Sequence, residues 1–498
     1  MKILTPTNDG AIDLVLDTLK NKKQCLVFAN TKRSAEKAAE DISKEIKSST
    51  KEQLELSNQI LHALSRPTKQ CERLSKCVKK GIAYHHAGLI GKQKELIEDA
   101  FKKGVVKIIC CTPTLAMGLQ LPAFRAIIKD LRRFGPRGLD WIPVLEYCQM
   151  IGRCGRPGYD KHGEAIVIAN NDGHKDKIHE KYILGEPEKI ESKLAAEPAL
   201  RTYLLSLIAT GYVNDLSQIF NFFKKTFWAF NYGDIEKLES IIHEMLSLLT
   251  EWNFLECSSK QADNSGFQSA SDYGKESYTA TPIGKRIAEL YIDPYTASNI
   301  IECLKRADEN TKSFPFLQAL SYTIEMKPLL SVRSKDREEV EQTLLKHSSS
   351  LLMNEPSEYD FGYENFVKSI KTAMMLYEWI NEKDEETLLE DFGIRPGEIR
   401  VKLERADWLI YCAGELSKLL NLKPIIKELI KVRLRLKYGV REQLLPLVRL
   451  EGIGRARARK LYFHNIRDLG DVRKAELSKL TSVLGKKIGE DVKRQVSG

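Results

Sequence analysis

Short apolar runs alternate with helical patterns over the first third of the chain. Each run is five to eight residues long and is followed by polar or glycine-containing positions, as buried parallel strands usually are. Between the runs, apolar residues recur at spacings of three and four, which predicts amphipathic helices. The expected strands are residues 24–30, 81–85, 105–112, 125–131 and 163–169. Strands that alternate with helices predict one parallel α/β sheet.

The pattern changes to helices beyond residue 185. Two short extended pieces, at 252–256 and 278–281, flank a polar stretch that is typical of a wing-like loop. Residues 291–430 are predicted to be all-helical, with apolar spacings of three and four in 366–379 and 396–419. The sequence therefore predicts a multidomain chain with one α/β domain followed by helical domains.

Positive charge gathers at the C-terminal end. The chain has 78 Lys and Arg against 68 Asp and Glu, and residues 431–498 alone hold 18 basic and 7 acidic residues. Within them, residues 450–461 (Leu-Glu-Gly-Ile-Gly-Arg-Ala-Arg-Ala-Arg-Lys-Leu) fit a helix-hairpin-helix, with Arg455, Arg457 and Arg459 around its turn. This pattern predicts phosphate binding without base readout. The alternative is a solvated cationic face without a specific partner.

Other bulk features exclude several classes of protein. No apolar run approaches the roughly 18 residues of a membrane span, and the first residues lack a signal-peptide core. The ten cysteines show neither paired spacing nor His partners, which favours buried reduced thiols in a cytoplasmic protein over disulfides or a metal site.

Polar motifs follow the expected strands. They are Asn-Thr-Lys-Arg-Ser at 30–34, Tyr-His-His-Ala-Gly-Leu at 84–89 and Thr-Pro-Thr-Leu-Ala-Met-Gly-Leu-Gln-Leu-Pro-Ala at 112–123. In a parallel sheet the carboxyl ends of the strands share one edge, where ligands bind. A further segment, Gln-Met-Ile-Gly-Arg-Cys-Gly-Arg-Pro-Gly-Tyr-Asp at 149–160, places Arg153 and Arg156 three residues apart among glycines. Their planar guanidinium groups suit phosphate.

A hairpin is predicted between the fourth strand and this arginine segment. Gly-Pro-Arg-Gly at 135–138 has turn chemistry, and extended pieces flank it. Arg133, Phe134 and Trp141 would lie on the hairpin, where an aromatic side chain could stack on the last base pair of a duplex. The alternative is a sheet edge with partly buried aromatic residues.

The order of these motifs resembles the second RecA-like domain of Ski-like superfamily 2 helicases. The resemblance implies that Thr31, His86, Thr112 and Thr114 contact the nucleic-acid backbone, which hydroxyl groups suit. For His86, a structural role at a helix start is the alternative. The resemblance also implies that Gly118 and Gln120 couple nucleotide to nucleic acid, although the family usually has Asn at the second position. Arg156 would be the principal arginine finger towards ATP, and Arg153 and Gln149 would support it.

Along its whole length the chain resembles the archaeal fork-repair DNA helicases related to the helicase part of DNA polymerase theta. The implied domains are a second RecA-like domain (1–185), a winged helix (186–290), a helical ratchet domain (291–430) and a helix-hairpin-helix tail (431–498). The family threads the tracked strand past a Trp and an Arg of one helix, the Arg about seven residues before the Trp. The corresponding residues here are Trp408 and Arg400, which lies one residue before the family's usual position at Val401. A core position is the alternative for Trp408.

The 498 residues contain no G-x-x-x-x-G-K-[ST] phosphate loop and no D-E-x-x box after a strand. In the family, these motifs lie on a first RecA-like domain that holds ATP and Mg²⁺. We therefore expect the C-terminal part of a monomeric, ATP-dependent 3′→5′ DNA helicase that binds single-stranded and forked DNA and is inactive alone. The alternatives are half of a split enzyme that works with a separate first RecA-like domain, an ATP-independent DNA-binding module, and an RNA helicase fragment.

Overall fold

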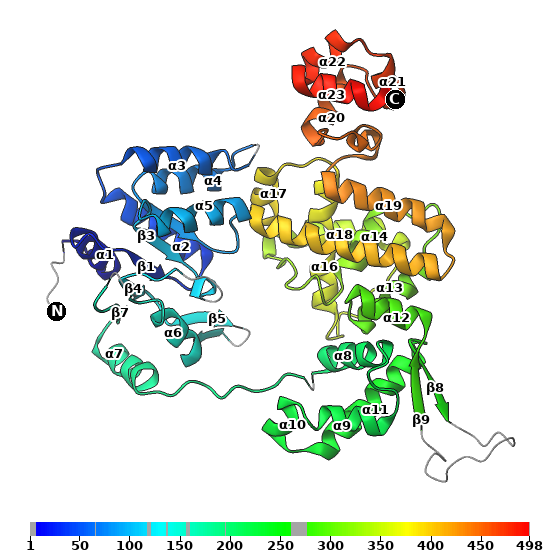
Figure 1. Cartoon of the computed structure of the whole chain (residues 1–498), viewed down its shortest axis with the longest axis horizontal. Helices are drawn as coiled ribbons and strands as arrows, with labels where there is room; N and C mark the ends of the chain where they lie inside the picture. The colour runs from blue at the N-terminus through cyan, green and yellow to red at the C-terminus, as the bar shows by residue number, and fades with distance from the viewer. Residues whose placement is uncertain are drawn as a thin grey trace. The chain divides into compact units, whose positions relative to one another are not determined.

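The computed structural model describes residues 6–64, 66–116, 121–135, 138–155, 160–194, 196–259 and 276–497. The chain groups into two compact units, coloured along the sequence in Figure 1. Unit 1 contains Met1–Ile190 and Glu385–Arg400, and unit 2 contains Glu191–Asp384 and Val401–Gly498.

Unit 1 is built on a parallel sheet with the strand order β2-β3-β1-β4-β7. In its central register, Val27 pairs with Cys110 on one side and with Ile127 on the other. Each strand lies inside one of the five predicted runs, so the predicted parallel sheet is confirmed. The strands are β1 Cys25–Phe28, β2 Ile82–His85, β3 Ile108–Cys111, β4 Arg125–Ile128 and β7 Glu164–Val167.

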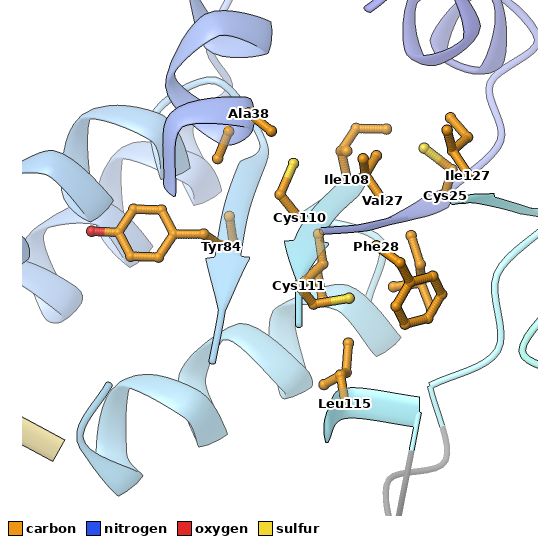
Figure 2. Close-up of a cluster of buried hydrophobic side chains, with 14 of the residues drawn as sticks. Cys25, Val27, Phe28, Ala38, Tyr84, Ile108, Cys110, Cys111, Leu115 and Ile127 are labelled. Carbon is orange, nitrogen blue, oxygen red and sulfur yellow. The ribbon is translucent and has the colours of Figure 1, made fainter. Parts of the chain in front are cut away.

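Helices cover both faces of this sheet. The connection through α2 runs from β1 to β2 and the connection through α5 runs back from β2 to β3, so right-handed crossovers place these two helices on opposite faces. Figure 2 shows Cys110 and Cys111 pointing to opposite faces of β3, with Ala38 on one side and Leu115 on the other. The helices of unit 1 are α1 Gly10–Lys20, α2 Lys32–Lys44, α3 Lys51–Leu61, α4 Lys69–Val78, α5 Gly91–Lys102, α6 Val144–Ile151, α7 Asp172–Ile178 and α17 Glu385–Phe392.

The helix α2 carries the first polar motif. Thr31 is its N-cap, and the threonine Oγ1 accepts a hydrogen bond from the Ser34 N–H over 3.0 Å. The predicted inner face is confirmed, because its four apolar members are all buried: Ala35, Ala38, Ala39 and Ile42. Glu36 is buried with them, although a charged side chain is seldom found in a core without a partner.

The predicted hairpin is present as β5 Arg132–Gly135 paired antiparallel with β6 Gly138–Trp141. Gly138 has a φ of +106°, which favours glycine at the turn. Trp141 lies at the base of the hairpin, where its ring contacts Tyr182 at 5.9 Å between centroids and the Arg132 guanidinium stacks at 4.3 Å. The tryptophan is therefore half-buried against the body of unit 1.

Unit 2 is mainly helical. A two-stranded antiparallel sheet pairs β8 Leu255–Ser259 with β9 Glu276–Ala280. It includes residues 255–256 of the first predicted extended piece and 278–280 of the second. The helical patterns predicted at 366–379 and 396–419 are confirmed as α16 and α18. The helices up to the tail are α8 Glu197–Ala209, α9 Leu216–Phe223, α10 Phe227–Tyr232, α11 Ile235–Glu251, α12 Pro282–Leu290, α13 Pro294–Arg306, α14 Ser313–Ser321, α15 Arg337–His347, α16 Tyr363–Ile380, α18 Pro396–Leu419 (in unit 2 from Val401) and α19 Lys423–Tyr438.

The basic tail has a hydrophobic core of its own, which includes Leu444, Leu461, Leu480 and Val492. Its helices are α20 Arg455–Phe463, α21 Leu469–Lys474, α22 Leu477–Leu484 and α23 Lys486–Ser497. Among the described residues of both units, no helix combines the length and the apolar character that crossing a membrane requires.

Candidate nucleic-acid interface

A hollow of about 680 Å³ lies where β1, β2 and β3 end, and we call it the strand-end groove. It brings together residues from six separate stretches of unit 1, and four of the predicted contact residues are among them. Those four are Thr31, Thr112, Thr114 and Arg133. The other charged residues that line the groove are Lys32, Arg33, Glu146 and Arg395.

The threonines offer the groove hydroxyl groups in fixed positions. Thr31 is exposed, and its Oγ1 accepts from the N-terminal turn of α2, which leaves its O–H available as a donor. Thr112 is buried at the end of β3, and its Oγ1 lies 2.8 Å from Oγ1 of exposed Thr114. Hydroxyl donors beside the positive end of a helix form a suitable surface for phosphate oxygens.

His86 lies behind the groove, because its side chain is fully buried and stacks on Tyr84 with ring centroids 5.5 Å apart. Its Nδ1 accepts a hydrogen bond from the Gly88 N–H over 3.1 Å, so in the neutral ring the proton is on Nε2. Nε2 lies 3.1 Å from Oε1 of Glu36. The predicted backbone contact by His86 is not available in this conformation, and the burial favours the structural alternative.

The buried carboxylate of Glu36 is the centre of a charged cluster. Its Oε1 accepts from Nε of Arg395 over 2.9 Å, and its Oε2 accepts from Nη1 of Arg73 over 3.1 Å. Although burial alone would raise the pKa of the Glu36 carboxyl, His86 and Arg395 lower it from 4.5 to about 2. Burial lowers the pKa of His86 despite the attraction of Glu36, so its ring is neutral at pH 7. The cluster joins α2, α4 and the segment 385–400.

The hairpin residues divide between the groove and the body of unit 1. Nη1 of Arg133 lies 2.9 Å from the Glu146 carboxylate, so this arginine is held at the wall of the groove. Trp141 is at the hairpin base, as described above. The side chain of Phe134 lies outside the described part of the chain, and its predicted stacking role stays a prediction.

The predicted ATP-facing segment connects to the loop after β3. Arg153 donates from Nε to the carbonyl oxygen of Ala116 over 3.1 Å, and its Nη2 donates to the same oxygen. Gln149 has a buried Oε1 that accepts no hydrogen bond from the described residues. Arg156, Gly118 and Gln120 lie outside the described residues. In this structure Arg153 therefore links the two predicted nucleotide-facing segments.

The predicted ratchet residues lie on α18. Arg400 is exposed and makes no hydrogen bond or ion pair to the described residues. Trp408 is half-buried, and its Nε1 donates to the carbonyl oxygen of Leu290 over 3.2 Å. The indole is thus anchored through its only donor, and a base could stack only on the remaining exposed part of the ring.

The three predicted arginines of the tail differ in their surroundings. Arg455 stacks on Trp379 at 4.1 Å and donates to the carbonyl oxygen of Lys383 over 3.0 Å. Nε of Arg459 donates to Oε2 of Glu382 over 2.9 Å. Arg457 is exposed, and among the described residues it donates only to the Gly452 carbonyl oxygen, over 2.8 Å. Of the three, Arg457 is the best placed to reach a phosphate.

The sequence patterns did not identify Glu36, Lys32 or Arg395 as site residues. Lys32 is within a quoted motif, but its ion pair with Glu398 joins positions more than 350 residues apart. Glu36 is next to Ala35 in the sequence but was not on the predicted inner face of α2, so no sequence pattern pointed to it. No group of described His, Cys, Asp and Glu side chains has an arrangement that could hold a metal ion.

Family models match two stretches of the chain: the helicase conserved C-terminal domain over residues 10–158, and domain 4 of archaeal helicases over residues 314–439. Relatives described as ATP-dependent DNA helicase Hel308 match nearly the whole chain. The Methanococcus vannielii protein is 36% identical, covering 98% of this chain and 67% of its own length. The chain belongs to the Hel308 family of archaeal helicases.

Two further members of the family give the same result. The Methanocella arvoryzae Hel308 is 38% identical over 96% of this chain and 63% of its own length. The Pyrococcus horikoshii Hel308 is 36% identical over 96% of this chain and 65% of its own length. The chain therefore spans about two thirds of the length of the Hel308 relatives it matches, and the predicted family resemblance is confirmed.

Proposed function

We propose that this chain is the DNA-tracking part of an ATP-dependent 3′→5′ DNA helicase that acts at forks during repair. The observation that carries the proposal is the strand-end groove, where Thr31, Thr112, Thr114 and Arg133 meet. These groups bind phosphate without reading bases, as a translocating motor requires. The Hel308 relatives, which are described as ATP-dependent DNA helicases, support DNA as the bound nucleic acid and ATP as the nucleotide.

We further propose the domain division given by the sequence: second RecA-like domain, winged helix, ratchet domain and helix-hairpin-helix tail. In this proposal Arg400 and Trp408 of α18 are further contacts of the single strand. Arg457 then contacts phosphate from the tail, while Arg455 and Arg459 hold α20 to its neighbours in unit 2.

ATP hydrolysis would require groups beyond those in these 498 residues. Phosphoryl transfer requires a phosphate loop, Mg²⁺ and an acid that orients water, all positioned together. We propose that a first RecA-like domain supplies them, that Arg156 reaches the γ-phosphate and that Gln149 supports it. Arg153 would join this site to the loop after β3 through the Ala116 carbonyl.

A single-turnover unwinding assay on a forked duplex tests the proposal. We expect no unwinding by the chain alone, and unwinding when a first RecA-like domain from a Hel308 relative is added. Arg156→Ala should then abolish unwinding, with a loss of about 10³-fold or more, because an arginine finger contributes that much. The matched control is Lys103→Gln, which removes a positive charge from the C-terminal end of α5 and should leave the rate unchanged. Unwinding by the chain alone would contradict the proposed division of labour.

A second candidate is an ATP-independent DNA-binding module, which the self-contained core of the basic tail favours. In that case, adding the first RecA-like domain would bring no ATP-dependent unwinding, while DNA binding would persist. RNA unwinding remains the third candidate. Matched DNA and RNA strands in the same binding assay distinguish them, and we expect tighter binding of DNA.

A further inference from the structure

One wall of the strand-end groove comes from the segment 385–400, which belongs to unit 1 although it is far along the chain. Its backbone is docked closely: the N–H of Gly397 donates to the carbonyl oxygen of Gly88 over 3.1 Å. A Cβ on Gly397 would lie 2.3 Å from the carbonyl oxygen of Leu89, so only glycine allows this approach. The side chain that this docking brings to the groove is Arg395.

Arg395 is oriented from one side only. Its Nε donates to Glu36 over 2.9 Å. Its Cδ packs against Gly88, where an added Cβ would lie only 2.3 Å from the Cδ. Glu36 also accepts from Nη1 of Arg73, and Nε2 of His86 lies 3.1 Å from its Oε1. The two terminal nitrogens of Arg395 make no hydrogen bond to any described residue. Four N–H donors of the guanidinium therefore have no partner in a groove lined with hydroxyl groups.

We propose that Arg395 is a phosphate-binding residue of the strand-end groove and that Glu36 is its positioning residue. This inference rests on the proposed function, because it names a further contact of the same tracked strand. A guanidinium whose Nε is already held loses little side-chain entropy when it grips a phosphate with its terminal nitrogens. The neighbouring cations Lys32 and Arg133 are paired with Glu398 and Glu146, so they would bind phosphate at the expense of those ion pairs.

Binding of a labelled single-stranded oligodeoxynucleotide to the full chain, measured over a series of salt concentrations, tests the contact. We expect Arg395→Gln to weaken binding about five- to tenfold and to lower the salt slope by about 0.7, the value for one phosphate on a single strand. Arg395→Lys should keep the slope and recover part of the affinity, since it keeps the charge without the fork. Lys103→Gln, at the opposite edge of the sheet, should stay within about twofold of the unmodified chain. An Arg395→Gln chain that behaves like Lys103→Gln would overturn the contact.

The positioning role of Glu36 can be tested with a variant for which charge alone and lost positioning predict opposite changes in DNA affinity. Glu36→Gln removes a negative charge beside the groove, which by charge alone would strengthen DNA binding. If Glu36 orients Arg395, we expect binding about threefold weaker, with the salt slope unchanged. Glu36→Gln should also change nothing further in an Arg395→Gln background. Tighter binding, or additive effects in the double variant, would overturn the positioning role.

Two controls separate this inference from the proposed function. Circular dichroism of each variant establishes that it is folded. If the unmodified chain does not bind the strand, the proposed function fails. If Thr31→Val weakens binding but Arg395→Gln does not, the groove stands and only the role of Arg395 is refuted.

Discussion

The strand-end groove of unit 1 and the basic tail of unit 2 were both predicted to contact phosphate, but from different kinds of signal. For the groove, the signal was a set of motifs that follow the strands, in which the resemblance to helicases assigned Thr31, Thr112 and Thr114 to backbone contact. For the tail, the signals were an excess of positive charge and a helix-hairpin-helix pattern around α20. The structure brings the three threonines to one hollow, whereas it pairs Arg455 and Arg459 with residues of unit 2 itself.

The difference follows from what each signal measures. The carboxyl ends of parallel strands share an edge because hydrogen bonding fixes their register, so residues that follow the strands must meet. A count of charges contains no information on partners. Arg459 has Glu382 within reach and Arg455 has the face of Trp379, and these contacts hold α20 in place. A position on a defined fold therefore predicts which side chains will meet, whereas local net charge does not.

The largest expected effect is the acid sensitivity that Glu36 gives to unit 1. The pKa of its carboxyl is about 2 in the folded chain and near 4.5 when unfolded, so the stability it confers is present above about pH 4.5. That stability is lost as the pH falls from there towards 2, and it amounts to about 3 kcal/mol. Glu36→Gln should remove this part of the pH dependence. Urea unfolding at several pH values, monitored by hydrogen exchange, measures this pH dependence of stability.

The tail is the internal control for this experiment. Peptides from β1, β2 and β3 should lose their acid dependence in Glu36→Gln, whereas peptides from α20 to α23 should behave as in the unmodified chain. Equal changes in both regions would mean that Glu36 acts on the stability of the whole chain, and the contrast between groove and tail would be lost.

Much of unit 1 could be predicted from the sequence because its signals are local. Five apolar runs gave five strands, and the spacing of Ala35, Ala38, Ala39 and Ile42 gave the buried face of α2. The turn residues at 135–138 gave the hairpin. Each of these follows from patterns within about ten residues, and the order of strands then placed four of the predicted contacts in one groove.

What could not be predicted depends on partners far away in the sequence. Nothing near Glu36 indicates that Arg395 will bind it, because the two positions are 359 residues apart. His86 follows a strand like the other motif residues, but stacking on Tyr84 and contact with Glu36 bury it. Arg153 was read as facing a nucleotide, and in this conformation it binds the Ala116 carbonyl oxygen.

A smaller effect is expected from the tail, where Arg455 and Arg457 provide a matched pair. Arg455→Gln removes the stacking on Trp379 and a hydrogen bond to Lys383, so the tail should lose about 1–2 kcal/mol of stability. Arg457→Gln should change stability by less than about 0.5 kcal/mol but lower the salt slope of DNA binding by about 0.7–0.9. Thermal unfolding and binding titrations measure both. If Arg455→Gln lowered the salt slope of DNA binding and left stability unchanged, Arg455 would be a phosphate contact like those proposed for the groove.

The smallest expected effect separates the two roles of the groove hydroxyls. Thr114 is exposed, and its hydroxyl bonds only to Thr112 within the part of the chain that the structure describes. Thr114→Val should therefore weaken DNA binding about three- to fivefold and leave stability within about 0.5 kcal/mol. Thr31→Val should weaken binding similarly and also cost about 1 kcal/mol of stability, because Thr31 caps α2. Thr114→Ser and Thr31→Ser keep the hydroxyl groups and should match the unmodified chain. If the two serine variants bound as weakly as the valine variants, a lost methyl contact would explain the effect, and the hydroxyls would have no part in gripping phosphate.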